Sequence, residues 1–320
     1  MLGSRAATTL HRAHRRRAVS PAAFRRFAFV ALGSLFVVVV TGAVVRLTAS
    51  GLGCENWPRC GETPFPEKEF HALIEFGNRV VALFAMGCTT LAALAARRVK
   101  GLPRWVVRTS AVVAATIVAQ VPLGGITVIL ELHPLAVMSH FLLALVAVAL
   151  AVVVALGADR FARDRPPAPF SPWVGRLALA LVPLALVLVV SGAFVTAAGP
   201  HSGGADIERL GNLLDAVYVH VRVTAVFGIG LLVLVALVFR AHGRAGLERA
   251  IAGGVLVLVV VQMVIGEVQW RNQLPWWLVL IHVALATAVW AGVVALAMLL
   301  HSASATDPAH PMRHARVSES

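Results

Sequence analysis

The sequence predicts an all-α integral membrane protein whose eight transmembrane helices form two tandem, pseudo-symmetric four-helix bundles. Three observations predict this fold class: the composition, the number of long apolar runs and an internal repeat. Of the 320 residues, 59% are hydrophobic and only 13% are charged, whereas a soluble domain is roughly 25% charged. The chain therefore has too few polar residues to cover soluble domains of this length.

Apolar runs long enough to cross a bilayer, about 20 residues each, occur eight times along the chain. Several begin at or just after a proline (Pro134, Pro172 and Pro275), where the missing N–H costs little. The first run is too long for a simple secretory signal and lacks a small-residue cleavage site. The expected spans are Phe27–Arg46, His71–Ala96, Trp105–Leu130, Leu135–Leu156, Trp173–Ala197, Leu213–Phe239, Ala250–Trp270 and Pro275–Leu300.

The second half of the chain repeats the first. At a shift of 142 residues, Gln120–Gly124 aligns with Gln262–Gly266, His140 with His282, and Asn78 with His220. At a shift of 150 residues, Thr41-Gly-Ala-Val-Val aligns with Ser191-Gly-Ala-Phe-Val. A parallel repeat of this kind predicts two similar halves related by an axis near the membrane normal. The expected division is a basic tail (1–26), an N-terminal half (27–157), a linker (158–172), a C-terminal half (173–300) and a second tail (301–320).

The net charge of +13 is distributed unevenly across the predicted membrane. One face, which carries both tails and the connections after the second, fourth and sixth spans, holds 21 of the 28 Lys and Arg residues. The positive-inside rule therefore predicts a multi-pass protein of the plasma membrane with both termini in the cytoplasm. No soluble domain carries a basic face interleaved with aromatic residues, so the charge does not indicate nucleic-acid binding.

Three histidines lie inside predicted spans, where ionisable residues are costly and usually functional. His140, His220 and His282 all fall on even-numbered spans, about 7–11 Å below the outward face at the helical rise of about 1.5 Å per residue. Neutral imidazoles at a common depth suit axial ligation of heme iron, and the two in the second half could hold one heme between them. The alternative is that each histidine hydrogen-bonds neighbouring helices together. No cysteine or carboxylate cluster accompanies the second-half pair, which disfavours zinc or copper.

The first half departs from the repeat, because Asn78 stands where the second half has His220. His71, Glu75 and Asn78 nevertheless share one helical face. Glu75 is expected either to pair with Arg79, four residues later, or to accept or relay protons beside a substrate or iron site.

Two arginines inside the predicted spans are candidate contacts for heme propionates, namely Arg79 and Arg222. The alternative for both is intrahelical pairing, or extension of the side chain toward the membrane surface.

The first outward loop contains two of the three cysteines, Cys54 and Cys60. So few cysteines exclude a disulfide scaffold. On the oxidising side of the membrane these two are expected to form a short, redox-labile disulfide, with a metal-binding pair as the alternative.

Two segments resemble a known family. Val44–Cys60 and His71–Arg79 are similar to the first outward loop and following helix of the heme A synthases, and the resemblance extends over Phe27–Leu300. It implies an enzyme of cytochrome oxidase assembly that converts heme O into heme A by oxidising the C8 methyl group to a formyl group.

The resemblance also implies where the hemes bind. Heme B, a cofactor, would lie in the C-terminal half between His220 and His282, and the substrate heme would lie in the N-terminal half near His140 and Glu75. Some family members have a histidine at the position of Asn78. Here the substrate iron would have His140 alone, recruit His71, or keep one open position.

The implied partners are the lipid bilayer, heme O delivered by a heme O synthase, and an electron donor or acceptor that the sequence does not identify. Homo-oligomerisation is left open. In this interpretation heme B exchanges electrons with the substrate heme, Glu75 manages protons, and the outward disulfide exchanges with a redox partner. The alternative function is a non-enzymatic transmembrane diheme electron carrier or heme transfer protein. A transporter is disfavoured, because no pair of spans is broken around a charged midplane site.

Overall fold

The computed structural model describes residues 18–54, 57–63, 65–66, 68–164, 170–201, 203–204, 207–241 and 245–304. Most of both predicted tails and part of the predicted linker therefore lie outside the described residues. Within the described part, eight helices are long and apolar enough to cross a membrane, which confirms the predicted fold class. They are α2 (Pro21–Leu47), α3 (Phe70–Ala96), α4 (Arg104–Ile129), α5 (Pro134–Arg163), α6 (Pro172–Ala198), α7 (Leu213–Arg240), α8 (Gly246–Arg271) and α9 (Trp276–Ser304).

Two helices, α2 and α5, extend furthest beyond the apolar runs that predicted them. α2 begins at Pro21, because the Ser20 hydroxyl accepts the N–H of Ala23 at 3.2 Å and proline suits the first turn. α5 continues to Arg163, whose side chain pairs with Asp159 at 2.9 Å. Asp159 also pairs with Arg25 of α2 at 2.5 Å, so charged residues at the predicted cytoplasmic end join the two helices.

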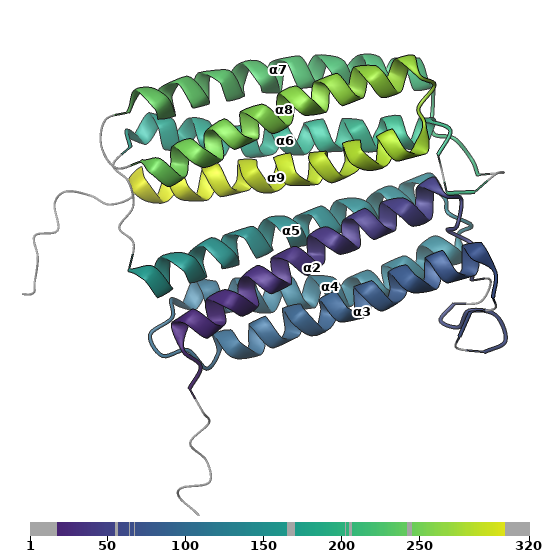
Figure 1. The fold of residues 1–320 in the computed structure, drawn as a ribbon, viewed down its shortest axis with the longest axis horizontal. Coiled ribbons are helices and arrows are strands. Elements are labelled where there is room, and N and C mark those ends of the chain that lie inside the picture. Colours follow the sequence, from purple (N-terminus) through teal and green to yellow (C-terminus); the bar gives the residue numbers. More distant parts are fainter. Residues whose placement is uncertain are drawn as a thin grey trace, which may run out of the picture.

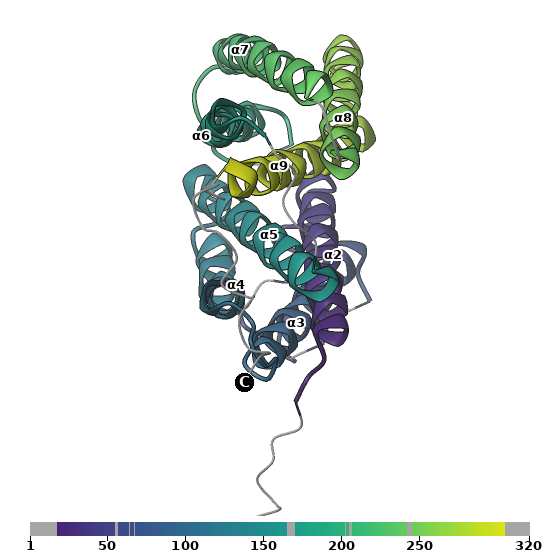
Figure 2. The same cartoon turned by 90° about the vertical axis from the view of Figure 1, so that its left-hand side faces the viewer.

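The helices form two stacked four-helix groups, α2–α5 and α6–α9 (Figures 1 and 2). In the first group, α2 and α4 each pack against both α3 and α5, so that α3 lies diagonally opposite α5. In the second group, α6 and α8 each pack against both α7 and α9, so that α7 lies diagonally opposite α9. The start of α2 and the end of α9 lie at the same end of the molecule (Figure 1).

The two groups meet mainly through α5 and α9, with α2 against α9 and α5 against α6 on either side. The buried indole N–H of Trp290 donates to the carbonyl of Leu145 at 2.8 Å. Near the other end, Arg46 Nη2 donates to the carbonyl of Thr196 at 2.6 Å. Arg46 and Thr196 are equivalent positions at the 150-residue shift, so the repeat is reflected in contacts between the halves.

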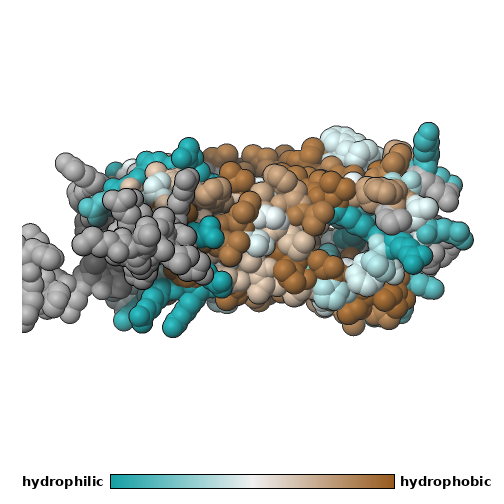
Figure 3. All heavy atoms as spheres, turned by 90° about the horizontal axis from the view of Figure 1, so that it is seen from below, coloured by the Kyte–Doolittle hydropathy of each residue, from teal (hydrophilic) through white to brown (hydrophobic). Residues whose placement is uncertain are grey.

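On the face shown in Figure 3, an apolar belt covers the middle of the molecule and hydrophilic residues gather at both ends. Large side chains on the outer helices are exposed there, including Leu83 of α3 and Val257 of α8, each 62% exposed. A water-soluble protein rarely exposes a continuous apolar surface of this extent. The belt therefore faces lipid, and the chain is a multi-pass membrane protein.

Candidate functional site

The histidines predicted to bind heme occupy diagonal helices of the two groups. His220 lies on α7 and His282 on the opposite helix α9, close enough for their imidazoles to interact electrostatically. His140 lies on α5, which is diagonal to α3 and therefore to Asn78. The repeat thus provides two equivalent inward-facing positions in each half, and three of the four are histidines.

A glycine on the preceding helix makes room for each imidazole ring. A Cβ at Gly192 would lie 3.1 Å from Cε1 of His220, and a Cβ at Gly266 would lie 3.3 Å from Cε1 of His282. In the first half, a Cβ at Gly124 would lie 3.3 Å from Cε1 of His140. Only glycine leaves the ring this close to the neighbouring backbone without contact from a side chain.

One of the second-half imidazoles has a defined hydrogen bond. Nδ1 of His220 lies 2.9 Å from the hydroxyl of Ser191, and that hydroxyl lies 2.8 Å from the carbonyl of Leu188. When the serine proton is directed to Leu188, Nδ1 of His220 donates to the serine oxygen. Nε2 of His220 then carries a free lone pair, as a metal ligand requires.

The other two histidines are held through their backbones. Nε2 of Gln262 donates to the carbonyl of His282, and Nε2 of Gln120 donates to the carbonyl of His140, both at 3.0 Å. Nδ1 of each of these two rings is buried and has no hydrogen-bond partner among the described residues. Buried polar atoms are rarely unpaired, and an unpaired imidazole in a bundle core is free to bind a ligand.

These features fit axial ligation of a heme. The two imidazoles lie on diagonally opposite helices, and a glycine on the preceding helix leaves each ring close to the neighbouring backbone. The part of the chain that the structure describes contains no group of three or more His, Cys, Asp and Glu side chains that could enclose a metal ion. His220 and His282 would therefore act as a pair of axial ligands rather than as part of a cage of protein ligands.

The first half keeps the hydrogen bond at the position of the missing histidine. The hydroxyl of Thr41 donates to Oδ1 of Asn78 at 2.7 Å, as Ser191 contacts His220 in the second half. Thr41 and Ser191 are themselves equivalent in the repeat. The first half therefore preserves the arrangement of the site but offers one imidazole, His140, at its core.

Glu75 holds the first outward loop against α3. The carboxylate is 6% exposed, and it accepts the Arg79 guanidinium at 2.5 Å and the backbone N–H of Cys54 at 2.8 Å. Arg79 also donates to the carbonyls of Pro58 and Arg59, at 3.3 Å and 2.9 Å. The intrahelical pair expected as one alternative for Glu75 and Arg79 is thus formed, and both residues organise the loop.

The loop itself covers part of the outward end of the first half. Cys54 and Cys60 form the predicted disulfide and are both buried. The indole of Trp57 reaches α4, where a Cβ at Gly125 would lie 2.6 Å from Cε2 of the ring. Gly125 is adjacent to Gly124, the glycine beside His140, so Trp57 and His140 pack against neighbouring positions of α4.

The remaining predicted site residues lie closer to the surface. His71 is exposed in the first turn of α3, and its Nδ1 lies 2.9 Å from the Ser50 hydroxyl. Arg222 is also exposed, with its guanidinium carbon 4.2 Å from the centre of the Tyr218 ring one turn earlier on α7. This is a cation–π contact within one helix.

Sequence reasoning did not assign roles to the residues that position the imidazoles. Gly192 and Ser191 contact His220, Gly266 contacts His282, and Gln262 binds the backbone of His282. All four belong to the segments that define the internal repeat. The alignment of polar and glycine positions with the histidines was therefore the signal that could have identified them.

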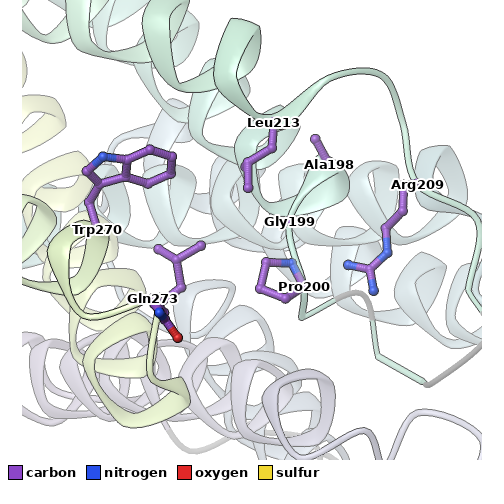
Figure 4. Close-up of a pocket in the computed structure, with 8 residues that line it drawn as sticks. Ala198, Gly199, Pro200, Arg209, Leu213, Trp270 and Gln273 are labelled. Carbon is purple, nitrogen blue, oxygen red and sulfur yellow. The ribbon is translucent and has the colours of Figure 1, made fainter.

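A cavity of about 530 Å³ lies at the outward end of the second half (Figure 4). The ends of α6 and α8 and the start of α7 surround it. Its lining residues are Ala198, Gly199, Pro200, Arg209, Leu213, Trp270, Gln273 and Leu274. A single arginine in a loop, such as Arg209, gives no sequence signal for a cavity.

Comparison with known proteins agrees with this arrangement. The heme A synthase of Symbiobacterium thermophilum is 29% identical over 272 residues, which cover 80% of this chain and 88% of that protein. The heme A synthase of Geobacillus kaustophilus is 31% identical over 107 residues, a third of each chain. That of Bacillus licheniformis is 39% identical over 71 residues, 22% of this chain and 24% of the relative. Two of these three alignments therefore span a third or less of the relative.

A family model described as cytochrome oxidase assembly protein matches residues 25–294, which include almost all of the eight helices. The resemblance predicted from the first outward loop and the Glu75 segment is thereby confirmed over most of the sequence. The chain belongs to this family of cytochrome oxidase assembly proteins.

Proposed function

We propose that this protein is a heme A synthase, an oxidoreductase that converts the C8 methyl group of heme O into the formyl group of heme A for terminal oxidases. The observation that carries the proposal is the unequal pair of sites. The second half offers two inward imidazoles, whereas the equivalent first-half site offers one imidazole opposite Asn78. Family membership supports the same function.

In the second half, His220 and His282 would hold heme B as its axial ligands. Bound there, heme B supplies one-electron redox chemistry. Ser191 would keep the proton of His220 on Nδ1 and so leave the lone pair of Nε2 free for the iron. Gly192 and Gly266 set how close each ring lies to its neighbouring helix.

In the first half, His140 would bind the iron of heme O. The Asn78 amide accepts a hydrogen bond from Thr41 and does not replace an imidazole, which leaves one coordination position open. His71 is a candidate for a second contact from the outward end, where it pairs with Ser50. Trp57 packs on Gly125 at the outward part of α4.

Glu75 is the candidate catalytic residue. It would accept or relay protons at the reacting methyl group, and its bonds to Arg79 and Cys54 hold it in a buried position. Because Cys54 is in the disulfide with Cys60, the carboxylate and the disulfide belong to one unit. Exchange of this disulfide with a redox partner would alter the position of Glu75. Arg79 and Arg222 remain candidates for contacts with propionates.

The orientation and partners follow from the charge distribution and the substrate. Both termini would lie on the cytoplasmic side of the plasma membrane, because the basic residues gather at that end. A heme O synthase would deliver heme O, and a redox partner at the outward face would exchange electrons. Homo-oligomerisation would use the lipid-facing surface of the helices.

The rival function is a diheme electron carrier or heme transfer protein built on the same bundle. Asn78 is the observation that favours catalysis, because an electron carrier would retain two axial ligands at each iron. A five-coordinate iron can bind an oxidant.

Pigment extraction separates the two functions. Cells that make heme O but no heme A should accumulate formyl heme when they express this chain. They should keep only heme O when they express the His140→Ala variant at the same membrane level. Unchanged heme O with the unmodified chain would support the carrier and contradict the synthase.

A further inference from the structure

The cavity at the outward end of the second half lies above the two imidazoles. Ala198 is six residues beyond Gly192 on α6, and Trp270 is four residues beyond Gly266 on α8. At about 1.5 Å per residue, these cavity residues lie roughly 6–9 Å outward of the glycines that contact His220 and His282. The cavity thus opens along the direction from the imidazole pair to the outward face.

The polar lining of the cavity is basic. Arg209 approaches from the loop before α7, while Trp270 and Gln273 approach from the end of α8 (Figure 4). Arg46, at the outward end of α2, is close enough to Arg209 for the two positive charges to repel each other. Arg209 lines the cavity, and the half-buried charge of Arg46 nearby adds to the attraction of this end for an anion.

Neither arginine is neutralised within the protein as described. Among the described residues, no carboxylate forms an ion pair with Arg46 or Arg209, and the hydrogen bond of Arg46 goes to the carbonyl of Thr196. By contrast, Arg271, at the same end of α8, pairs with Glu267 at 2.5 Å. Among the described residues, the Arg209 guanidinium that lines the cavity therefore has no carboxylate partner.

We propose that this cavity is a carboxylate-binding site, in which Arg209, supported by the charge of Arg46, receives the propionate groups of the heme held by His220 and His282. The inference rests on the proposed function and adds an anchoring residue to it. Heme propionates are carboxylates, and the cavity lies outward of the two imidazoles that would hold the iron. Arginine binds carboxylates through two parallel hydrogen bonds, which would also fix the rotation of the heme about the axis between its ligands.

The test uses the full chain with His140→Ala, so that heme binds in the second half alone. This protein is purified from heme-depleted cells and titrated with heme B or with heme B dimethyl ester, in which the propionates are uncharged. We expect Arg209→Gln to weaken heme B binding about ten- to a hundredfold, the usual effect of losing a charged hydrogen bond. The protein that keeps Arg209 should bind the dimethyl ester about as weakly as the Arg209→Gln protein binds heme B. The Arg209→Gln protein should bind heme B and its ester with equal affinity.

Two further measurements separate a direct contact from damage to the fold. Arg209→Gln should lower the midpoint potential of the bound heme, because a positive charge near the iron disfavours the ferric state, and Arg209→Lys should restore part of the potential. Arg271→Gln is the matched control, because Arg271 is an outward arginine that already pairs with a carboxylate. It should change neither the affinity for heme B nor the midpoint potential of the bound heme.

The outcomes distinguish the inference from the proposed function. If heme B binds normally but the ester binds equally well, the propionate site is wrong and the histidine pair stands. If Arg209→Gln instead loses a copurifying anionic phospholipid without affecting heme affinity, the cavity binds lipid phosphate and the inference is overturned. If no low-spin heme B binds at all, both the cofactor site and this inference fail.

Discussion

Glu75 combines a structural role with its proposed catalytic role, and two substitutions can separate them. Ala at this position leaves the buried N–H of Cys54 and the Arg79 guanidinium without their acceptor. Glu75→Ala should therefore lower the free energy of unfolding by about 1–3 kcal/mol and abolish heme A formation. Glu75→Gln keeps an acceptor oxygen and should preserve most of the stability, measured by denaturant unfolding in detergent.

The glutamine variant decides between the two roles. If Glu75 transfers protons, Glu75→Gln should accumulate heme O with little heme A, although the loop remains in place. Near-normal heme A from Glu75→Gln would mean that the carboxylate serves only to hold the loop.

Glycines beside the imidazoles provide a second residue-scale prediction. Ala at Gly266 or Gly192 would bring a methyl group within 3.3 Å or 3.1 Å of a ligand ring, so the ring must shift. We expect changed g-values in the electron paramagnetic resonance spectrum of the ferric heme, larger for Gly192→Ala. Gly254→Ala is the matched control on α8, because no atom lies within 4 Å of a Cβ there. Spectra that are identical in all three variants would show that the glycines do not position the ligands.

At the scale of helix pairs, each inward position is supported by the helix before it in the chain. In α2 and α6, a hydroxyl residue followed by glycine contacts Asn78 and His220 respectively. In α4 and α8, a glutamine and a glycine contact His140 and His282 respectively. The pairs are therefore interchangeable units, and the first half lacks only the imidazole.

This equivalence predicts the effect of Asn78→His. The new imidazole should use the Thr41 hydroxyl as His220 uses Ser191, and should convert the first site into one with two axial ligands. The protein loaded with heme in both halves should then gain a second low-spin signal and lose heme A synthesis, because the open position is filled. Asn78→Gln, which keeps the amide, should show neither the added signal nor a six-coordinate first site. A His variant without a new low-spin signal would contradict the equivalence of the two halves.

The sequence predicted which segments form helices, but it did not predict where the helices end or which path the loops take. Runs such as Leu135–Leu156 are apolar enough to identify α5, but ion pairs of Asp159 with Arg25 and Arg163 extend that helix to Arg163. The path of the first outward loop depends on hydrogen bonds to Glu75 and Arg79 and on contact of Trp57 with Gly125. These contacts join residues distant in sequence and have no periodic pattern.

For the whole molecule, the asymmetric charge predicts one topology. A green fluorescent protein fused after Ser320 should fluoresce, because this reporter folds in the cytoplasm. Alkaline phosphatase at the same position should be inactive, because that enzyme is active only on the outward side of the membrane. Alkaline phosphatase fused after Gly61, in the first outward loop, should be active. The reverse pattern of activities would contradict the proposed orientation.

The repeat also determined how much of the site could be predicted. It aligned His140 with His282 and Asn78 with His220, and so indicated which positions are equivalent. It did not reveal that the residues conserved between the halves, such as Gln262 and Gly266, position a ligand, because that requires the packing of α8 against α9. The outward cavity at Arg209 also depends on packing, since it is made by the ends of three helices.

The central claim is that the second half holds a heme between His220 and His282, while the first half has one iron ligand. The most direct measurement is the low-spin ferric heme signal of the purified protein in three single variants. We expect His220→Ala and His282→Ala each to abolish this signal and His140→Ala to retain it. Retention of the full signal in both second-half variants, or its loss only with His140→Ala, would contradict the assignment.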